Sequence, residues 1–314
     1  MRLKGKEIIV TGGAGFIGSN LVEELSKENK VYVIDNMHTG CEENLKEAMK
    51  TGNVTLIKDD VKNIRNHKIN AEIVFHLGIY SSSPMYRRNP SLVGEAINGM
   101  ISVLEYAKEN NATVVFASTS SIYNGLKAPH REDMLPIVTD YYTEARLACE
   151  RISELYSKLH SLNVAAMRFF SVYGKNDERK KEYANLITQF TLAIKQNKQP
   201  IIYGDGNQKR DFVHVSDVVE ALILATKTKG FEIFNVGTGK NHSLNEIVEK
   251  INNQLGKDIK PKYVPLQIKN YVMETLASTK KSEEKLGFKA KINVDKGIEI
   301  HTQYLSQQYS NFVS

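Results

Sequence analysis

The feature that most constrains the fold is a glycine-rich turn near the N-terminus. A short apolar run at 7–11 leads into Thr-Gly-Gly-Ala-Gly-Phe-Ile-Gly at 11–18, and apolar residues at helical spacing follow. Glycine permits a tight turn, and backbone N–H groups that no side chain covers can approach a phosphate. The order of strand, glycine turn and helix therefore predicts a dinucleotide-binding unit.

Strand-like and helical stretches alternate through the first half of the chain. We expect strands at 7–11, 30–35, 54–58, 72–77, 113–117 and 163–168. We expect helices between them at 16–28, 89–110 and 142–160. Repeated units of a strand followed by a helix predict an α/β fold, a Rossmann-type doubly wound parallel sheet with helices on both faces.

The alternation loosens after Gly174. We expect helices at 183–196, 216–226, 243–255 and 294–309, and short extended segments at 200–203, 231–236 and 261–264. We therefore expect a dinucleotide-binding Rossmann domain over 1–174 and a smaller substrate-binding α/β portion over 175–314. The segments near 200–203 and 232–236 are candidates for rejoining the main sheet.

The basic charge of the chain does not by itself identify a partner. The 314 residues hold 42 Lys and Arg against 36 Asp and Glu, a formal net charge of +6. This excess is compatible with nucleic acid, an acidic surface or a small phosphorylated substrate. The lysine-rich stretches lie between or on expected helices, so we interpret them as solvated surface and not as a nucleic-acid site.

Composition excludes several other classes of protein. Hydrophobic residues make up 41% and charged residues 25% of the chain, as in globular proteins. Cys41 and Cys149 are too few for a disulfide framework or a four-thiolate metal site, and the histidines show no ligand spacing. No apolar run is long enough for a secretory signal or a membrane helix. We expect a cytoplasmic protein without a metal site.

Asp35 ends the second expected strand, where a carboxylate binds the ribose hydroxyls of an adenosine. No arginine follows it, since the next residues are Asn36 and Met37. A carboxylate at this position repels a 2′-phosphate, so the sequence favours NAD over NADP as the cofactor.

The motifs together resemble one known family. Gly12-x-x-Gly15-x-x-Gly18, with the Asp-Asn-x-x-Thr-Gly sequence of 35–40, is similar to the extended short-chain dehydrogenase/reductases. The particular resemblance is to their NAD-dependent nucleotide-sugar epimerase/dehydratase branch. It covers nearly the whole chain, with specific blocks at 118–123, 168–174, 202–218 and 234–239. It implies NAD as cofactor, a UDP-sugar as substrate, and a homodimer formed through the helices at 89–110 and 142–160.

The resemblance also implies which residues form the two binding sites. Its cofactor residues are Gly12, Gly15, Phe16, Ile17, Gly18, Asp35, Asn36, Thr39, Gly40, Asp60, Val61, Leu77, Gly78, Tyr142 and Arg146. Its substrate residues are Ser81, Thr119, Tyr142, Ser171, Asn185, Leu186, Tyr203 and Arg210, the last of which is expected on the nucleotide diphosphate.

Thr119, Tyr142 and Arg146 occupy the catalytic positions of the family. There the tyrosine accepts a proton from a sugar hydroxyl while NAD takes hydride from the same carbon, and the threonine hydrogen-bonds that oxygen. A lysine four residues after the tyrosine usually supplies a positive charge on the same helix face and holds the nicotinamide ribose. Arg146 replaces that lysine. It keeps the charge and can still donate to ribose, but it cannot relay a proton.

The residues after Thr119 bear on the reaction class. Dehydratases of the family carry an Asp-Glu pair there, whereas this chain has Ser120 and Ser121, which cannot protonate a leaving hydroxyl. Two reactions through a 4-keto sugar remain. They are 4-epimerisation of a UDP-hexose or UDP-N-acetylhexosamine, and decarboxylation of UDP-glucuronate. The segment 82–90 is similar to a decarboxylase loop, but the rest of the chain is closer to the 4-epimerases, so epimerisation is favoured.

Departures from the family pattern keep a third interpretation open, a catalytically weak nucleotide-sugar-binding protein. Arg146 is the first departure, and Ser171 replaces an asparagine. Met273 stands where a second phosphate-binding arginine is expected, and Lys269 could substitute for it. A lost charge-assisted hydrogen bond costs about 1.5–3 kcal/mol when nothing replaces it.

Overall fold

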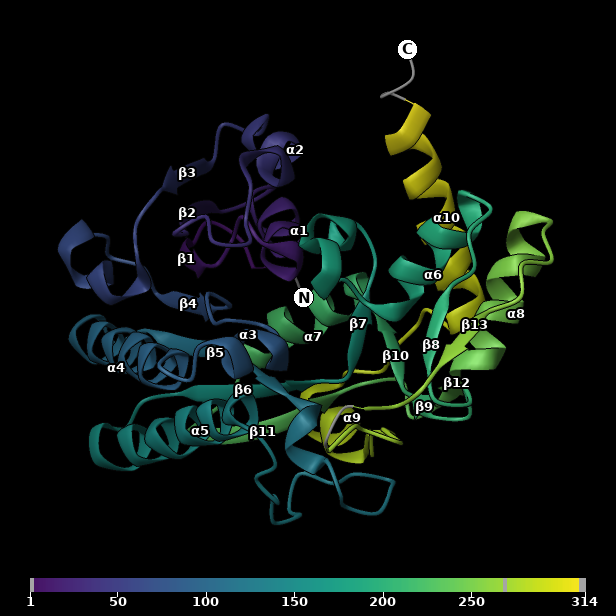
Figure 1. Ribbon diagram of the computed structural model, residues 1–314. Coiled ribbons are helices and arrows are strands. Elements are labelled where there is room, and N and C mark those ends of the chain that lie inside the picture. Colours follow the sequence, from purple (N-terminus) through teal and green to yellow (C-terminus); the bar gives the residue numbers. More distant parts are fainter. Residues whose placement is uncertain (1–2, 268–269, 311–314) are drawn as a thin grey trace.

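A seven-stranded parallel sheet forms the centre of the protein (Figure 1). The computed structural model describes residues 3–267 and 270–310. The strands run across the sheet in the order β11-β6-β5-β4-β1-β2-β3, and every neighbouring pair is parallel. They are β1 (Glu7–Thr11), β2 (Lys30–Ile34), β3 (Val54–Ile57), β4 (Ile73–His76), β5 (Thr113–Thr119), β6 (Val164–Phe169) and β11 (Phe231–Val236). The expected Rossmann-type sheet is therefore confirmed.

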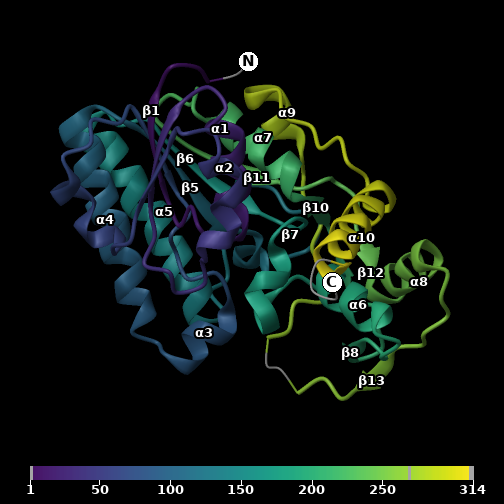
Figure 2. The ribbon, with the colours of Figure 1, turned by 90° about the horizontal axis from the view of Figure 1, so that it is seen from above.

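Helices cover both faces of the sheet, as the view from above shows (Figure 2). One face carries α4 and α5, whose apolar sides pack with Val114 and Ala166 of the sheet. The other carries α1 and α7, packed over Val10 and Phe234. The helices of this half are α1 (Phe16–Leu25), α2 (Lys46–Met49), α3 (Ser83–Arg88), α4 (Leu92–Asn110), α5 (Tyr141–His160) and α7 (Val215–Ala225), with 3₁₀ helices η1 (Glu42–Leu45), η2 (Val61–His67) and η3 (Ser120–Tyr123).

Apart from α7, β11 and α9 (Lys280–Leu286), the second half of the chain builds a smaller lobe with its own apolar core around Phe190, Ile247 and Ile298. Its helices are η4 (Asp177–Tyr183), α6 (Leu186–Lys195), α8 (Leu244–Leu255) and α10 (Val294–Ser310). Its short strands are β7 (Ser171–Tyr173), β8 (Ile201–Tyr203), β9 (Lys209–Arg210), β10 (Phe212–His214), β12 (His242–Ser243) and β13 (Lys262–Val264). The helix α9 packs instead on β11 of the main sheet and on α7. Within the described ranges, no helix combines the length and apolarity needed to cross a membrane.

The two segments that could rejoin the main sheet behave differently. The strand β11 pairs with β6 along its whole length and forms one edge of the sheet. The strand β8 instead pairs with β13, so the expectation for 200–203 is wrong. Only Ile202 of its three residues is buried, and a strand inside a sheet covered on both faces needs a continuous apolar run.

The expected helix at 89–110 also differs from the structure. The chain forms the separate helix α3 first, and α4 begins only at Leu92. Pro84 lies in the first turn of α3, where its missing N–H costs nothing, and Pro90 lies in the break between the two helices.

Because three histidines are buried, we expect the free energy of unfolding to depend on pH. Burial lowers the pKa of His76 and His301 to about 3 and that of His214 to about 4, below the ordinary value of 6.5. The folded protein therefore keeps these rings neutral while the unfolded chain takes up protons below pH 6.5. The free energy of unfolding falls as the pH drops through this window.

Replacing His301 by Gln removes one of these groups. We expect the loss of unfolding free energy between pH 7 and pH 5, measured by urea titration, to shrink by about 2 kcal/mol. The control is His160→Gln, because His160 is exposed at the end of α5. An unaltered pH dependence in His301→Gln would contradict the assignment of a neutral buried ring.

Candidate active site

The glycine turn brings two segments of backbone into close contact at the carboxyl edge of the sheet. Gly12 has a φ of +67°, and a Cβ at this position would lie 2.6 Å from the Cα of Gly78, which follows β4. A Cβ on Gly18 would lie 2.1 Å from the carbonyl oxygen of Gly12. Neither position admits a side chain. The turn therefore presents bare backbone N–H groups at the start of α1, an arrangement that fits the pyrophosphate of a dinucleotide.

The Asp35 carboxylate lies at the end of β2, beside this turn. Its two oxygens accept hydrogen bonds from the N–H groups of Ala14, at 2.9 Å, and Met37, at 2.8 Å. Burial raises the pKa of Asp35, and both hydrogen bonds oppose that rise. The side chain is thus fixed at the wall of the site, where a carboxylate can accept from the ribose hydroxyls of NAD.

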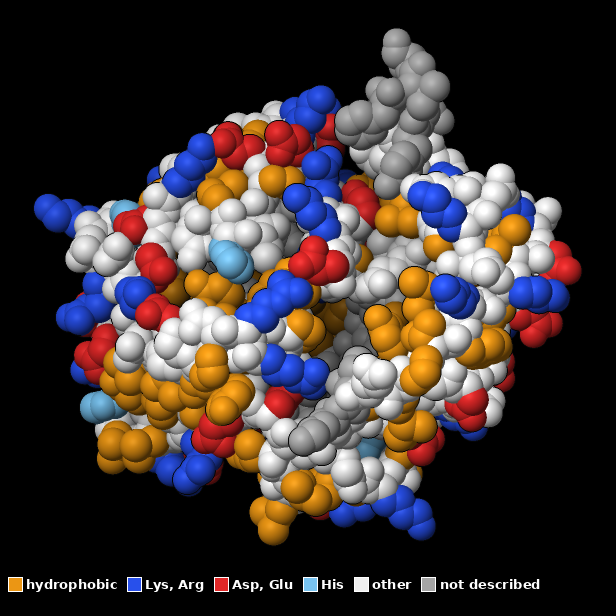
Figure 3. All heavy atoms as spheres, in the orientation of Figure 1, with side chains coloured by type: hydrophobic (Ala, Val, Ile, Leu, Met, Phe, Trp, Pro, Cys, Tyr) orange, Lys and Arg blue, Asp and Glu red, His pale blue; other side chains and the backbone are white. Residues whose placement is uncertain are grey.

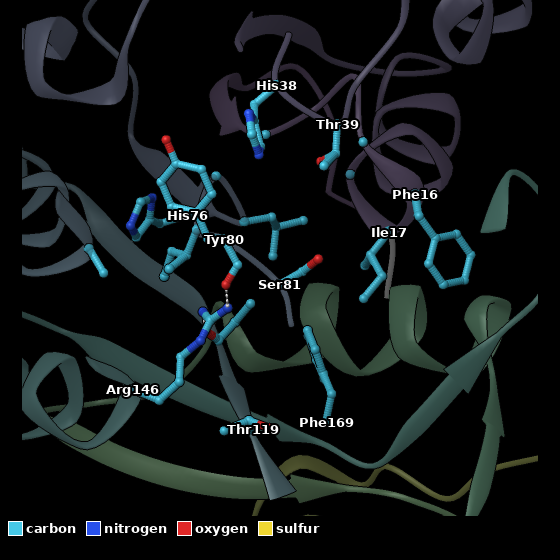
Figure 4. Close-up of a pocket in the computed structure, with 18 of the residues that line it drawn as sticks. Phe16, Ile17, His38, Thr39, His76, Tyr80, Ser81, Thr119, Arg146 and Phe169 are labelled. Carbon is cyan, nitrogen blue, oxygen red and sulfur yellow. Dashed lines mark hydrogen bonds between the residues drawn. The ribbon is translucent and has the colours of Figure 1, made fainter. Parts of the chain in front are cut away.

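A cavity of about 360 Å³ lies between the two lobes, over the carboxyl ends of the strands (Figures 3 and 4). This is the position where open α/β sheets bind ligands. Most of the predicted site residues line it. They are Gly12, Gly15, Phe16, Ile17, Gly18, Asp35, Asn36, Thr39, Asp60, Val61, Leu77, Gly78, Ser81, Thr119, Tyr142, Arg146, Ser171 and Asn185.

Four predicted residues lie outside the lining of this cavity: Gly40, Leu186, Tyr203 and Arg210. Gly40 is next to Asp35, and Leu186 opens α6 directly after Asn185. Tyr203 is 46% exposed on β8. Arg210 is buried, donates to the carbonyl oxygens of Lys209 and Val272, and lies over the ring of Tyr271. Their part in binding stays a prediction.

Thr119 and Tyr142 reach the cavity from neighbouring elements. Thr119 is the last residue of β5, and its hydroxyl accepts a hydrogen bond from the N–H of Ser121 at 3.1 Å. Tyr142 lies in the first turn of α5, which Asp140 caps by accepting from the N–H of Thr143 at 2.8 Å. Both side chains are less than a tenth exposed. The structure thus gathers the predicted hydroxyl pair around one space.

Arg146 is almost entirely buried and makes two hydrogen bonds to backbone. Its guanidinium donates to the carbonyl oxygen of Ala117 at 2.7 Å and to that of Tyr80 at 2.9 Å (Figure 4). The centre of the guanidinium lies 5.2 Å from the centroid of the Tyr142 ring. Arg146 therefore places a fixed positive charge beside the candidate base and ties β5 to the loop after β4.

A buried ion pair holds α5 against the sheet below these residues. Arg168 of β6 meets Glu150 of α5 at 2.7 Å, with both side chains 3% exposed. Ser118 donates to the same carboxylate at 2.5 Å, and Arg168 also donates to the hydroxyl of Tyr123 at 2.8 Å. Because these partners satisfy the buried charges, the network fixes the distance between α5 and the ends of β5 and β6.

The cavity has an uneven distribution of charge. Its lining carboxylates are Asp35, Asp59, Asp60 and Glu95. Thr119 and the two serines that follow it contribute only hydroxyl groups to the lining. His76 lines the cavity, but burial lowers its pKa to about 3, and its Nδ1 lies 2.7 Å from the hydroxyl of Thr11. No carboxylic acid suited to dehydration therefore stands beside Thr119 in the lining.

Sequence reasoning missed several lining residues, among them Tyr80, Lys180 and Tyr183. They belong to no motif, and Lys180 falls in a lysine-rich stretch interpreted as solvated surface. Met273 is 54% exposed, and Lys269 lies outside the described residues. Across the part of the chain that the structure describes, no three His, Cys, Asp or Glu side chains form a group that could hold a metal.

Comparison with known proteins agrees with this geometry. A family model described as the NAD dependent epimerase/dehydratase family matches residues 8–237. A putative UDP-glucose 4-epimerase of Methanocaldococcus jannaschii is 33% identical over 298 residues, 93% of this chain and 95% of that protein. A UDP-N-acetyl-alpha-D-glucosaminuronate decarboxylase of Bacillus cytotoxicus is 33% identical over 273 residues, 83% and 84% of the two.

A solved structure is similar over the whole chain. It is the UDP-N-acetylglucosamine 4-epimerase from Methanobrevibacter ruminantium in complex with UDP-N-acetylmuramic acid, at 30% identity. The TM-score is 0.92, and the match covers 98% of this chain and 100% of that one. The similarity therefore includes both lobes and the cavity between them.

The two hydrogen bonds of Arg146 predict that lysine cannot replace it without loss. An ammonium can reach one of the two carbonyl groups, which leaves the other unsatisfied. We expect Arg146→Lys to lower the free energy of unfolding by about 1–3 kcal/mol, measured by urea titration. The control is Arg151→Lys, because Arg151 is exposed on the same helix. Equal stability of the two variants would contradict the bridging role.

Proposed function

Because this chain belongs to the NAD-dependent epimerase/dehydratase family, an enzyme family that acts on nucleotide sugars, we propose that it is a UDP-hexose or UDP-N-acetylhexosamine 4-epimerase. NAD is its cofactor. One observation carries the choice of reaction. Thr119 and Tyr142 line the same cavity as the glycine turn, and the residues that follow Thr119 in the lining are Ser120 and Ser121, which carry no carboxylate.

The proposed mechanism assigns one task to each of three side chains. NAD, when bound, supplies the hydride acceptor and donor for C4 of the sugar. Tyr142 accepts the proton of the C4 hydroxyl, and Thr119 donates a hydrogen bond to the same oxygen. The guanidinium of Arg146 lies 5.2 Å from the centroid of the Tyr142 ring, so a positive charge stands beside the side chain that exchanges the proton. After the 4-keto sugar has rotated to present its other face, Tyr142 returns the proton to the C4 oxygen and the reaction is complete.

The wall of the cavity suits a sugar that must turn between the two hydride transfers. Ser81, Ser120, Ser121 and Ser171 line it with small hydroxyl groups. Small hydroxyls can exchange one hydrogen bond for another at little cost, whereas a charged clamp would hold one orientation. This feature supports epimerisation over a reaction that needs a single sugar orientation.

A second candidate, decarboxylation of UDP-glucuronate, is supported by the similarity to a uronate decarboxylase. The side chains of the segment 82–90, which is similar to a decarboxylase loop and contains α3, weigh against it. Arg88 donates to the hydroxyl of Tyr183 at 2.6 Å and pairs with Glu182 at 3.5 Å, and neither Arg87 nor Arg88 lines the cavity. Both arginines of this segment therefore lie outside the cavity that would hold the sugar. The third candidate, a weak binding protein, predicts no turnover.

The homodimer expected from the resemblance is part of the proposal. Two leucines on α5, Leu155 and Leu159, are 53% and 67% exposed, and α5 packs side by side with α4. Apolar side chains gather over these helices on the face seen in Figure 3. Such a patch is typical of a surface that another copy of the chain covers.

The proposal predicts that the purified protein interconverts at least one pair of 4-epimers without added reductant. A panel of UDP-glucose, UDP-galactose and their N-acetyl forms, followed by chromatography, tests this expectation. Tyr142→Phe removes the proton acceptor, so we expect turnover to fall at least about 100-fold. The control is Tyr141→Phe, because Tyr141 is 52% exposed. No interconversion of any of the four sugars by the unaltered protein would reject the 4-epimerase.

A further inference from the structure

The 3₁₀ helix η4 crosses from the smaller lobe to the glycine turn. Tyr183, at its end, accepts the hydrogen bond from Arg88 of α3, and the guanidinium of Arg179 lies 3.9 Å from the sulfur of Cys41. Glu178, near its start, accepts from the hydroxyl of Tyr304 at 2.9 Å. The segment is therefore attached at both ends and spans one side of the cavity.

Lys180 lies in the middle of this segment and reaches the first residue of α1. Its ammonium nitrogen is 5.6 Å from the centroid of the Phe16 ring, and both residues line the cavity. Its side chain is only 19% exposed. The lining contains one other Lys or Arg, the guanidinium of Arg146, which is bound to the carbonyl oxygens of Ala117 and Tyr80. Of the two cationic side chains in the lining, Lys180 is therefore the one that lies beside the glycine turn.

A buried carboxylate holds Lys180 in this position. Asp177 is fully buried, and one of its oxygens accepts from the N–H of Asn185 at 2.8 Å and from the hydroxyl of Thr188 at 2.6 Å. The other oxygen has no hydrogen-bond partner among the described residues, and the ammonium of Lys180 lies 3.6 Å from it. At that distance the attraction orients the lysine while its donors stay available.

We propose that Lys180 binds the pyrophosphate of NAD, with Asp177 as its positioning residue. The N-terminus of α1 provides N–H groups and about half a positive charge, whereas a pyrophosphate diester carries two negative charges. Lys180 supplies a full charge beside the first residue of α1. The proposal rests on the NAD site and not on the sugar reaction, so it fails or holds independently of the 4-epimerase activity.

The test measures ligand binding by calorimetry on protein freed of NAD. We expect Lys180→Ala to lower the affinities for NAD and for ADP-ribose by the same factor, about 10- to 100-fold. This is the effect of losing one charge-assisted hydrogen bond. We expect adenosine, which has no phosphate, to bind unchanged. The control is Lys181→Ala, which removes the same charge from an exposed neighbour that does not line the cavity.

A second variant separates binding from folding. Lys180→Ala leaves Asp177 without its counter-charge, so the double variant Asp177→Asn with Lys180→Gln removes both charges and keeps the buried hydrogen-bond acceptor. We expect it to unfold at the temperature of the unaltered protein and to bind NAD as weakly as the single variant. NAD affinity equal to that of Lys181→Ala overturns the proposal. So does a loss confined to UDP, which would assign Lys180 to the substrate diphosphate.

Discussion

The structure depends on a close backbone contact between the glycine turn after β1 and Gly78 after β4. These two strands are neighbours at the centre of the sheet, where the order of connection reverses and the strand ends separate. A Cβ at Gly12 would lie within 2.6 Å of Gly78 and push the two segments apart. Because the two segments lie so close together, α1 begins directly above the point where the ends of β1 and β4 diverge. Its first N–H groups therefore face the cavity. The contact therefore sets both the packing of the first lobe and the cofactor site.

The candidate catalytic side chains depend on a second constraint, the buried polar network beneath α5. The pair of Glu150 and Arg168 fixes that helix against β6, and Ser118 joins the pair to β5. A buried ion pair adds little stability compared with an apolar contact, but it tolerates few geometries. It therefore suits a helix whose Tyr142 must stay aligned with the end of the neighbouring strand.

The sequence predicted what depends on local pattern. The bounds of β1, the turn that follows it and the carboxylate of Asp35 could all be read from residue types and spacing. The partner of β8 could not, because a three-residue strand carries too little pattern to specify a neighbour. The site shows the same division. Arg146 could be recognised by its position four residues after Tyr142 in the sequence. Its hydrogen-bond acceptors could not, because they are the backbone carbonyl groups of Ala117 and Tyr80, which any residue type can provide. The position of Lys180 in the cavity could not be predicted either, because only the fold places it beside Phe16.

The central claim is that hydride leaves C4 of a UDP-sugar and returns to the same carbon within one enclosed site. A UDP-hexose or UDP-N-acetylhexosamine with deuterium at C4, mixed with unlabelled substrate in ordinary water, tests this claim most directly. Mass spectrometry of the product is the readout. The account predicts a 4-epimer that retains its deuterium, with no transfer to unlabelled molecules. Loss of the label to water, or its transfer between substrate molecules, would contradict it.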